Sequence, residues 1–211
     1  IGSAKEPVTV LAARQWLWKP PGLALEVLAA HVMPNAPEVA ELLGMAAGRL
    51  ERLTGRTQVD GYQSGPERVD AIVQGVFEAV TDWHVRYSEP PASWADQGQK
   101  IRTPADLRGT RLGTCLDTTL LFAATLEQAG LRPLVWMLNG HAFVGWWRYE
   151  LDNWSAVSTD VPDIINRLAL GQIGVVETTL ATDRQQAVAF RDACAAAEQR
   201  VRLDQFDVTC E

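Results

Sequence analysis

Residues 111–130 read RLGTCLDTTLLFAATLEQAG, and this stretch decides the fold. Apolar residues occupy most sides of the helix that the pattern predicts from Cys115 to Ala129. We therefore expect a central helix that is covered on most sides. Gly130 supplies a normal C-terminal stop. Thr114 and Asp117 have the spacing of a capping box, which places Cys115 in the first turn of the helix.

Helical patterns dominate the chain before this stretch. Single apolar stripes predict two amphipathic helices, and shorter patterns predict a strand and a short helix before them. The two amphipathic helices are expected over residues 36–55 and 66–87. The strand is expected at 7–12 and the short helix at 20–32. A Pro- and Gly-containing connector at 88–113 has little period of its own, and its length indicates a functional loop.

Strand signals follow the central helix. In PLVWMLNGHAFVGWWRY, residues 133–149, two apolar runs flank Asn139-Gly140, the preferred pair for a two-residue hairpin turn. Asp160 and Gly171 bound a capped helix. A further strand is expected at 173–180 and a last helix at 184–203. The predicted class is α+β, with the central buried helix packed on a short antiparallel sheet and a helical N-terminal portion.

Composition narrows the function classes. The chain has 211 residues and a net charge of −7, which argues against direct binding to a nucleic-acid backbone. Three widely spaced cysteines do not form a disulfide framework and favour a reducing compartment. No run of about 18 apolar residues and no signal peptide is visible, so we expect a cytoplasmic protein that does not bind membranes.

We expect one domain in three parts. A mainly helical portion covers residues 8–102, a core of catalytic type covers 103–182, and a C-terminal helix covers 183–211. The chain begins with Ile1 rather than Met, so we expect a piece of a longer protein, or one with tag residues at its start.

Cys115 is the first residue that points to chemistry. The first turn of a helix offers unpaired N–H groups and the positive end of the helix dipole, and both favour a thiolate, the nucleophilic form. The alternative is a small buried residue at a helix start.

His141 directly follows the Asn-Gly turn and therefore begins a strand. If the hairpin packs beside the helix start, the imidazole can act as the general base for Cys115. The alternative is a turn histidine with a satisfied ring. We interpret the two remaining histidines, His31 and His84, as structural.

A histidine base usually needs an acid that orients it. Glu177 lies in the apolar stretch GVVETT, where glutamate is disfavoured and a buried charge requires a partner. It is therefore the favoured acid, and an exposed or edge position is its alternative. Asp160, already explained as a helix cap, and Asp152 are the fallback acids.

Two other interpretations stay open. A zinc site from Cys115, His141 and Glu177 is chemically feasible, but Cys and His do not recur at ligand spacing. Five tryptophans either line an aromatic groove for an extended substrate or serve as packing; they are Trp94, Trp136, Trp146, Trp147 and Trp154.

The motifs GTCLDTTLLFAATLEQAGL, GHAFVGWW and VVETTL resemble the transglutaminase-like branch of the papain-like cysteine proteinases over about residues 103–180. The chain also resembles an uncharacterised domain near the N-terminus of large bacterial helicase-like proteins, some of which carry a nuclease domain. That second resemblance covers about residues 8–182 and rests on HVMPNAPEV, DGYQSGPERV, PPASW, GQKIR and GTCLD.

The resemblance implies a cysteine-proteinase fold with Cys115 as nucleophile, His141 as base and Glu177 as orienting acid, although the usual acid is Asp. For the oxyanion we expect the backbone N–H of Cys115 and the side chain of Gln99. The expected activity is cysteine-dependent acyl transfer on an amide bond of a protein or peptide, without a cofactor. The alternative is a non-catalytic recognition module of a multidomain helicase-like protein, with antiphage defence as one role that such a protein could have. Other domains of a longer chain are the expected partners.

Overall fold

The centre of the fold is a three-stranded antiparallel sheet with the order β5-β6-β7. Its strands are β5 (Pro133–Leu138), β6 (His141–Trp147) and β7 (Ile173–Val176). Leu138 pairs with His141, so β5 and β6 form the expected tight hairpin. This computed structural model describes residues 14–17, 21–89, 98–138, 140–150, 157–158, 160–182 and 187–203.

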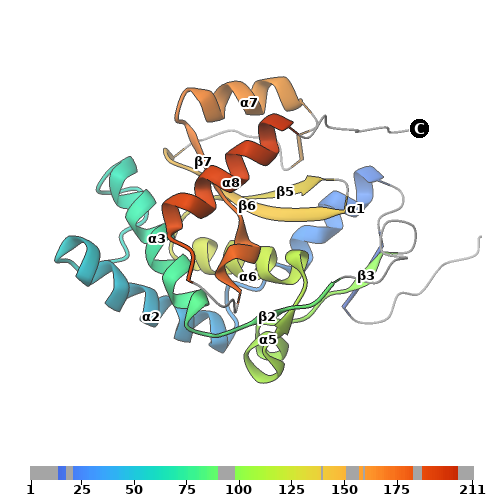
Figure 1. Ribbon diagram of the computed structural model, residues 1–211, viewed down its shortest axis with the longest axis horizontal. Helices are drawn as coiled ribbons and strands as arrows, with labels where there is room; N and C mark the ends of the chain where they lie inside the picture. The colour runs from blue at the N-terminus through green and yellow to red at the C-terminus, as the bar shows by residue number, and fades with distance from the viewer. Residues whose placement is uncertain are drawn as a thin grey trace, which may run out of the picture.

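Helix α6 (Cys115–Gln128) packs against β5 and β6, as Figure 1 shows. Every residue from Cys115 to Leu126 is buried. A helix of this length with no exposed stripe over 115–126 must be covered on all sides, in agreement with the apolar residues on most of its sides. The expected α+β class and the central buried helix beside a short antiparallel sheet are confirmed.

The helical N-terminal portion covers one flank of α6. Helices α2 (Pro37–Thr54) and α3 (Pro66–Thr81) pack closely on each other and contact α6 (Figure 1). A Cβ at Gly75 would lie 2.9 Å from the carbonyl oxygen of Ala46, so glycine permits this close approach. Before them come α1 (Pro21–Leu28) and the short η1 (Ala29–His31).

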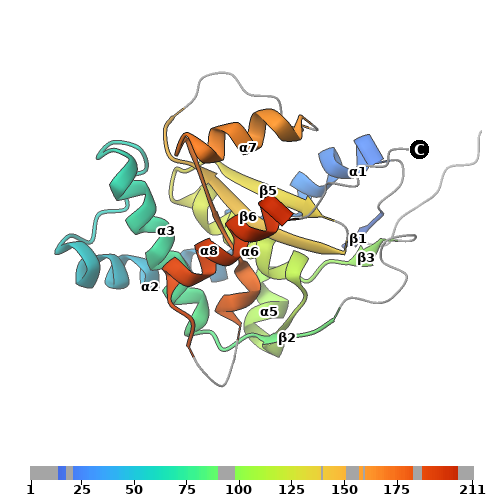
Figure 2. The same cartoon turned by 45° about the horizontal axis from the view of Figure 1, so that its top comes forward.

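The opposite face of the sheet carries α7 (Val161–Ala169) and α8 (Phe190–Leu203), as the tilted view in Figure 2 shows. Residues of β6 alternate between the two faces. Phe143 and Trp147 pack with Ala197 and Val201 of α8. The intervening Val144 and Trp146 belong to the larger core beneath the sheet, which includes α6.

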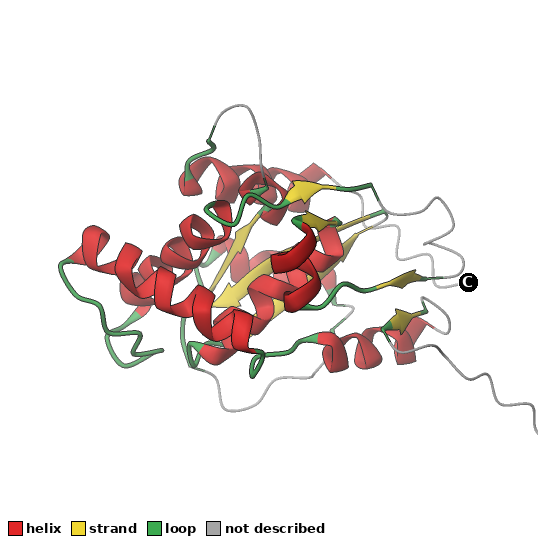
Figure 3. Ribbon diagram, turned by 90° about the horizontal axis from the view of Figure 1, so that it is seen from below, coloured by secondary structure: helices red, strands yellow, loops and turns green. Residues whose placement is uncertain are grey.

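The segment at 88–113, expected as one loop, contains regular structure where it is described. β3 (Gln99–Lys100) pairs with β1 (Gln15–Trp16), and α5 (Pro104–Thr110) follows it. β4 (Leu112–Gly113) then pairs in parallel with β2 (Arg86–Tyr87). A second capping box, formed by Thr103 and Asp106, starts α5 and is the local signal that the loop interpretation missed. β1 and β3 lie at the end of the molecule away from α2 and α3 (Figures 1 and 3).

Three expected element bounds were wrong. The helix expected over 66–87 ends at Thr81, and Tyr87 lies instead in β2. His84 adopts φ +53°, which turns the chain so that β2 can pair with β4. This pairing is a tertiary contact that no helical stripe reveals.

The strand expected over 173–180 ends at Val176, and η2 (Thr178–Ala181) follows it. The last helix begins at Phe190 rather than at residue 184. At this helix start the ring of Phe190 contacts the rings of Phe77 and Trp146. The strand expected at 7–12 lies outside the described residues. No helix in the described ranges is long and apolar enough to cross a membrane.

Candidate active site

Cys115 occupies the first position of α6, and the predicted capping box is present. Thr114 Oγ1 accepts the N–H of Asp117 at 3.2 Å, and Asp117 Oδ2 accepts the N–H of Thr114 at 2.9 Å. The box fixes the first turn, so the backbone N–H of Cys115 stays at the open end of the helix. The Cys115 residue is only 1% exposed.

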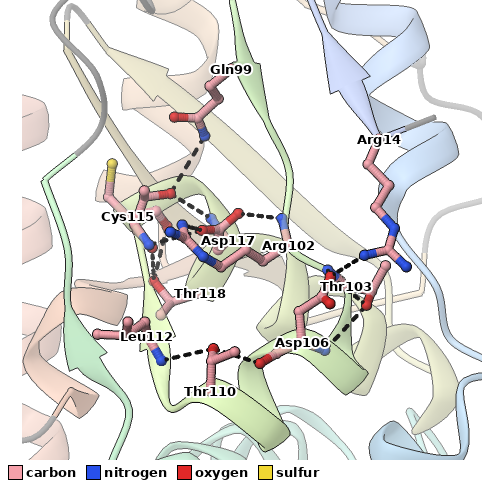
Figure 4. A network of polar contacts seen from close by, with 11 residues as sticks. Arg14, Gln99, Arg102, Thr103, Asp106, Thr110, Leu112, Cys115, Asp117 and Thr118 are labelled. Atoms are coloured by element: carbon pink, nitrogen blue, oxygen red, sulfur yellow. Dashed lines mark hydrogen bonds and ion pairs between the residues drawn. The ribbon is translucent and has the colours of Figure 1, made fainter. Parts of the chain in front are cut away.

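Arg102 balances the charge of Asp117. Its guanidinium lies 2.8 Å from Asp117 Oδ2, and its backbone N–H donates to Oδ1 at 2.8 Å (Figure 4). Asp117 is fully buried, and a buried carboxylate two residues from a proposed thiolate would oppose that thiolate unless it were paired. Arg102 was not identified from sequence, because nothing in GQKIR indicates that its guanidinium meets an acid 15 residues further along the chain.

His141 begins β6 and faces Glu177. Its Nε2 lies 2.7 Å from Glu177 Oε2, and the two side chains are 15% and 3% exposed. Burial by itself lowers the pKa of His141, but hydrogen bonds to Cys115 and Glu177 and the charges of both groups outweigh it and raise this pKa to about 9. Because Nε2 is engaged with Glu177, Nδ1 is the ring nitrogen left to face the sulfur.

Glu177 follows β7 as the first residue outside it and caps η2. Its Oε1 accepts the backbone N–H of Thr179 at 3.1 Å and the hydroxyl of the same residue at 2.8 Å. Its Oε2 contacts two side chains: the Nε2 of His141 and the Nε of Arg200, which lies 2.9 Å away. Burial raises the pKa of Glu177, but the bonds and charge of His141 and the bonds from Thr179 prevail and lower it. The expectation that Glu177 lies inside a strand was wrong. β7 ends at Val176, and the Glu177 side chain caps the short helix η2 that follows.

A cluster of threonines joins the segment that carries Glu177 to the helix that carries Cys115. The hydroxyls of Thr118 and Thr119 donate to the carbonyl oxygen of Cys115 at 2.9 and 2.8 Å. Thr178 Oγ1 lies 3.1 Å from Thr119 Oγ1 and 3.4 Å from Thr118 Oγ1. All three hydroxyls are buried, so they fix the start of η2 against the first turn of α6.

Tyr87 lies beside the thiol and was not identified from sequence. Its phenol hydrogen-bonds with Cys115, and the Tyr87 residue as a whole is 42% exposed. Burial, the charge and hydrogen bond of Cys115, and the charges of Glu89 and Glu177 raise the pKa of Tyr87 to about 12. Tyr87 is therefore a neutral, partly exposed hydrogen-bond partner of a thiol that is almost completely buried.

Gln99 reaches over the start of α6 from β3, as Figure 4 shows. Its Nε2 lies 3.4 Å from Thr114 Oγ1, a long contact. Its Oε1 is buried and has no hydrogen-bond partner among the described residues. An orphaned buried polar atom beside a helix start is a site that can receive a ligand group.

The remaining predicted residues lie elsewhere or outside the described part. Asp160 caps α7, where it accepts the N–H of Asp163 at 3.2 Å, and Asp152 is not described. Trp136, Trp146 and Trp147 are buried in the core, which contradicts their use as an open groove; Trp94 and Trp154 are not described. Within the described ranges, no group of three or more His, Cys, Asp or Glu is arranged to hold a metal ion.

The geometry is the only guide to the role of this cluster. No family model matches the chain, and no curated protein or solved structure is significantly similar to it.

Proposed function

We propose that this protein is a cysteine-dependent acyl-transfer enzyme that cleaves amide bonds, with Cys115 as nucleophile, His141 as acid–base and Glu177 as the acid that orients it. The observation that carries this proposal is the position of His141 between a buried thiol and a buried carboxylate. A nucleophile, a base and an orienting acceptor in this order form the arrangement that nucleophilic catalysis requires.

Three different parts of the chain supply these groups, which supports a functional origin for the cluster. A helix start, a hairpin turn and the end of a strand each place one polar group at the same point. Buried ionisable groups cost free energy to desolvate, and a strongly raised histidine pKa in such a setting is typical of functional sites.

The reaction would begin when the Cys115 sulfur attacks the amide carbonyl carbon, forming a C–S bond and a tetrahedral oxyanion. The imidazolium of His141 then gives its proton to the leaving nitrogen as the C–N bond breaks, which leaves a thioester and a free amine. Water, deprotonated by His141, attacks the thioester. The C–S bond breaks, the carboxylic acid leaves, and the thiolate–imidazolium pair is restored.

Gln99 and the backbone N–H of Cys115 are the proposed oxyanion donors. The hydroxyl of Thr114 accepts the N–H of Asp117 and has its own proton to donate. If the Gln99 amide is rotated by 180°, its oxygen accepts that proton and its NH₂ takes the place of the orphaned Oε1. Amide orientation is an assignment based on such networks. The rotated form satisfies the buried oxygen and presents an N–H donor to the site.

The order of cysteine on a buried helix, histidine on a strand and acid after the next strand supports a transglutaminase-like cysteine-proteinase fold as part of this proposal. Hydrolysis is favoured over cross-linking, because water is always available and no feature of the described residues selects an amine acceptor. A peptide or protein amide is the proposed substrate.

The pH dependence of iodoacetamide alkylation at Cys115, read by peptide mass spectrometry, tests the proposal. We expect alkylation well below pH 8.5, the ordinary range of a free thiol, and loss of that reactivity in His141→Ala. Cys194 is an internal control, because burial and the charges of Glu198 and Asp70 raise its pKa to about 12. His31→Ala is the matched substitution, at a partly buried histidine in η1.

An ordinary thiol profile that His141→Ala leaves unchanged would refute the enzyme proposal. The cluster would then belong to a non-catalytic recognition module within a longer protein.

A further inference from the structure

Resting on the proposed function, we propose that Arg200 of α8 is a positioning residue of the site, which balances the charge of Glu177 and thereby lowers the pH range over which Cys115 and His141 are ionised as a pair. The last helix would then be part of the catalytic machinery rather than a cover on the sheet.

Helix α8 holds residue 177 at two points. The backbone N–H of Glu177 donates to the carbonyl oxygen of Ala193 at 3.1 Å, and Arg200 Nε meets its Oε2 at 2.9 Å. Ala193 and Arg200 are two helical turns apart and therefore lie on nearly the same side of α8. The small buried side chains of Ala193 and Ala197 let the helix approach the sheet closely.

Arg200 and His141 meet the same carboxylate oxygen. An arginine that only anchored the helix could use any surface acid, whereas this one meets a carboxylate whose side chain is 3% exposed. Burying a charge without a partner is costly, and partner charges offset that cost. Arg200 is thus a second cation at an oxygen that already serves the histidine.

The balance of charge explains why a second cation helps. Glu177 and Arg200 together are neutral, so proton transfer from Cys115 to His141 leaves the whole cluster neutral. Without Arg200, the same transfer gives a thiolate and a carboxylate against one imidazolium. The cluster then carries a net negative charge before and after the transfer. A negative buried cluster holds its protons more tightly, so both Cys115 and His141 would lose their protons at higher pH.

A positive charge acts on both ionisations in the same direction. Among the described residues, the charged or titratable groups around His141 are Cys115 from α6, Glu177 from the end of β7, Arg200 from α8, and Tyr87 from β2 beside the sulfur. Removing Arg200 takes away a repulsion on the imidazolium and an attraction on the thiolate. The pH profile of thiol reactivity has an acid limb, set by ionisation of Cys115, and a basic limb, set by loss of the proton from His141. Both limbs should therefore move to higher pH without Arg200.

A purely structural loss gives a different result. If Arg200→Gln merely loosened α8, the Cys115–His141 pair would separate. The acid limb would then rise toward the ordinary thiol range, while the histidine titration would fall toward its ordinary value of about 6.5. The direction of the basic limb distinguishes electrostatic balance from packing.

The experiment measures the full pH profile of Cys115 alkylation and the titration of His141 by NMR of labelled histidine, in the wild type, Arg200→Gln and Arg200→Lys. The chain has only three histidines, so His141 is assignable with His141→Gln. Arg191→Gln is the matched control, because Arg191 is on the same helix and its side chain is 94% exposed.

We expect Arg200→Gln to raise both limbs by about 0.5–1 pH unit, which reduces alkylation near pH 6 about three- to tenfold. The 47% exposure of the Arg200 side chain keeps the effect at this modest size. Arg200→Lys should restore most of the wild-type profile, and Arg191→Gln should leave it unchanged.

Unchanged limbs in Arg200→Gln, or a histidine titration that falls, would overturn this inference while leaving an activated Cys115 intact. A wild-type profile without activation would refute the proposed function itself, so the two failures are distinguishable.

Discussion

His141 Nε2 and Glu177 Oε2 lie 2.7 Å apart although 36 residues separate them in the chain. The hairpin turn delivers the histidine, and the end of β7 delivers the carboxylate. β6 and β7 pair in antiparallel register with Val144 opposite Val176, so both residues come to the same end of the sheet. The contact is thus a product of sheet register, and its chemistry can be tested one residue at a time.

Glu177→Gln should remove the charge that stabilises the imidazolium while keeping the size of the side chain. We expect the His141 pKa to fall toward its ordinary value, and alkylation of Cys115 at pH 6 to slow by about tenfold or more. Alkylation rates and histidine NMR measure the two effects. Asp160→Asn is the control, since Asp160 only caps the exposed α7; it should cost about 1 kcal/mol of stability at most and leave Cys115 unaffected. Equal effects from the two variants would contradict the assignment of Glu177.

Tyr87 should limit access to the thiol of Cys115. The two residues hydrogen-bond with each other, and Cys115 is only 1% exposed whereas Tyr87 is 42% exposed. Tyr87→Ala should therefore accelerate labelling by a bulky maleimide more than labelling by iodoacetamide. Competition labelling with mass spectrometry measures the ratio. Tyr149→Ala, which alters a tyrosine of similar exposure, should leave the ratio unchanged. A ratio that Tyr87→Ala does not change would show that the phenol does not cover the sulfur.

The His141 pKa of about 9 also predicts a pH dependence of stability. A histidine whose folded pKa is raised contributes stability that is complete below its unfolded value of about 6.5 and is lost as pH rises through about 9. We expect the stability advantage of the wild type over His141→Gln to shrink across this window, by about 3 kcal/mol at most. Urea unfolding at several pH values measures it. An advantage that grows with pH would contradict the raised pKa.

The two capping boxes offer a matched pair of substitutions. Asp117→Ala removes a fully buried carboxylate and leaves Arg102 and the N–H of Thr114 without their acceptor, so we expect a loss of about 3 kcal/mol or more. Asp106→Ala removes the same motif residue from α5, where the side chain is 33% exposed, and should cost about 1 kcal/mol. Thermal and urea unfolding measure both. Equal losses would show that burial of Asp117 adds nothing to the box.

Local signals determined much of this protein. The Thr114–Asp117 box, the tight hairpin between β5 and β6 and the Asp160 cap depend on contacts within a few residues, and each appears as its pattern predicts. The burial of 115–126 was also predicted, from apolar residues on most sides of the helix, although distant elements cover it. The order of Cys115, His141 and Glu177 along the chain, on a helix start and two expected strands, suggested a common site. Glu177 added a specific signal, because a carboxylate in an apolar stretch requires a partner when it is buried.

Tertiary structure decided the rest. Tyr87 lies in β2 rather than in the expected helix, because β2 pairs with β4. Glu177 lies outside the expected strand, because its carboxylate caps η2. Arg102 and Arg200 reach the site from an extended segment and from the last helix, and no periodicity indicates which acid an arginine will meet. Side-chain periodicity reports the face that a residue occupies, whereas the partner across that face depends on how distant elements pack.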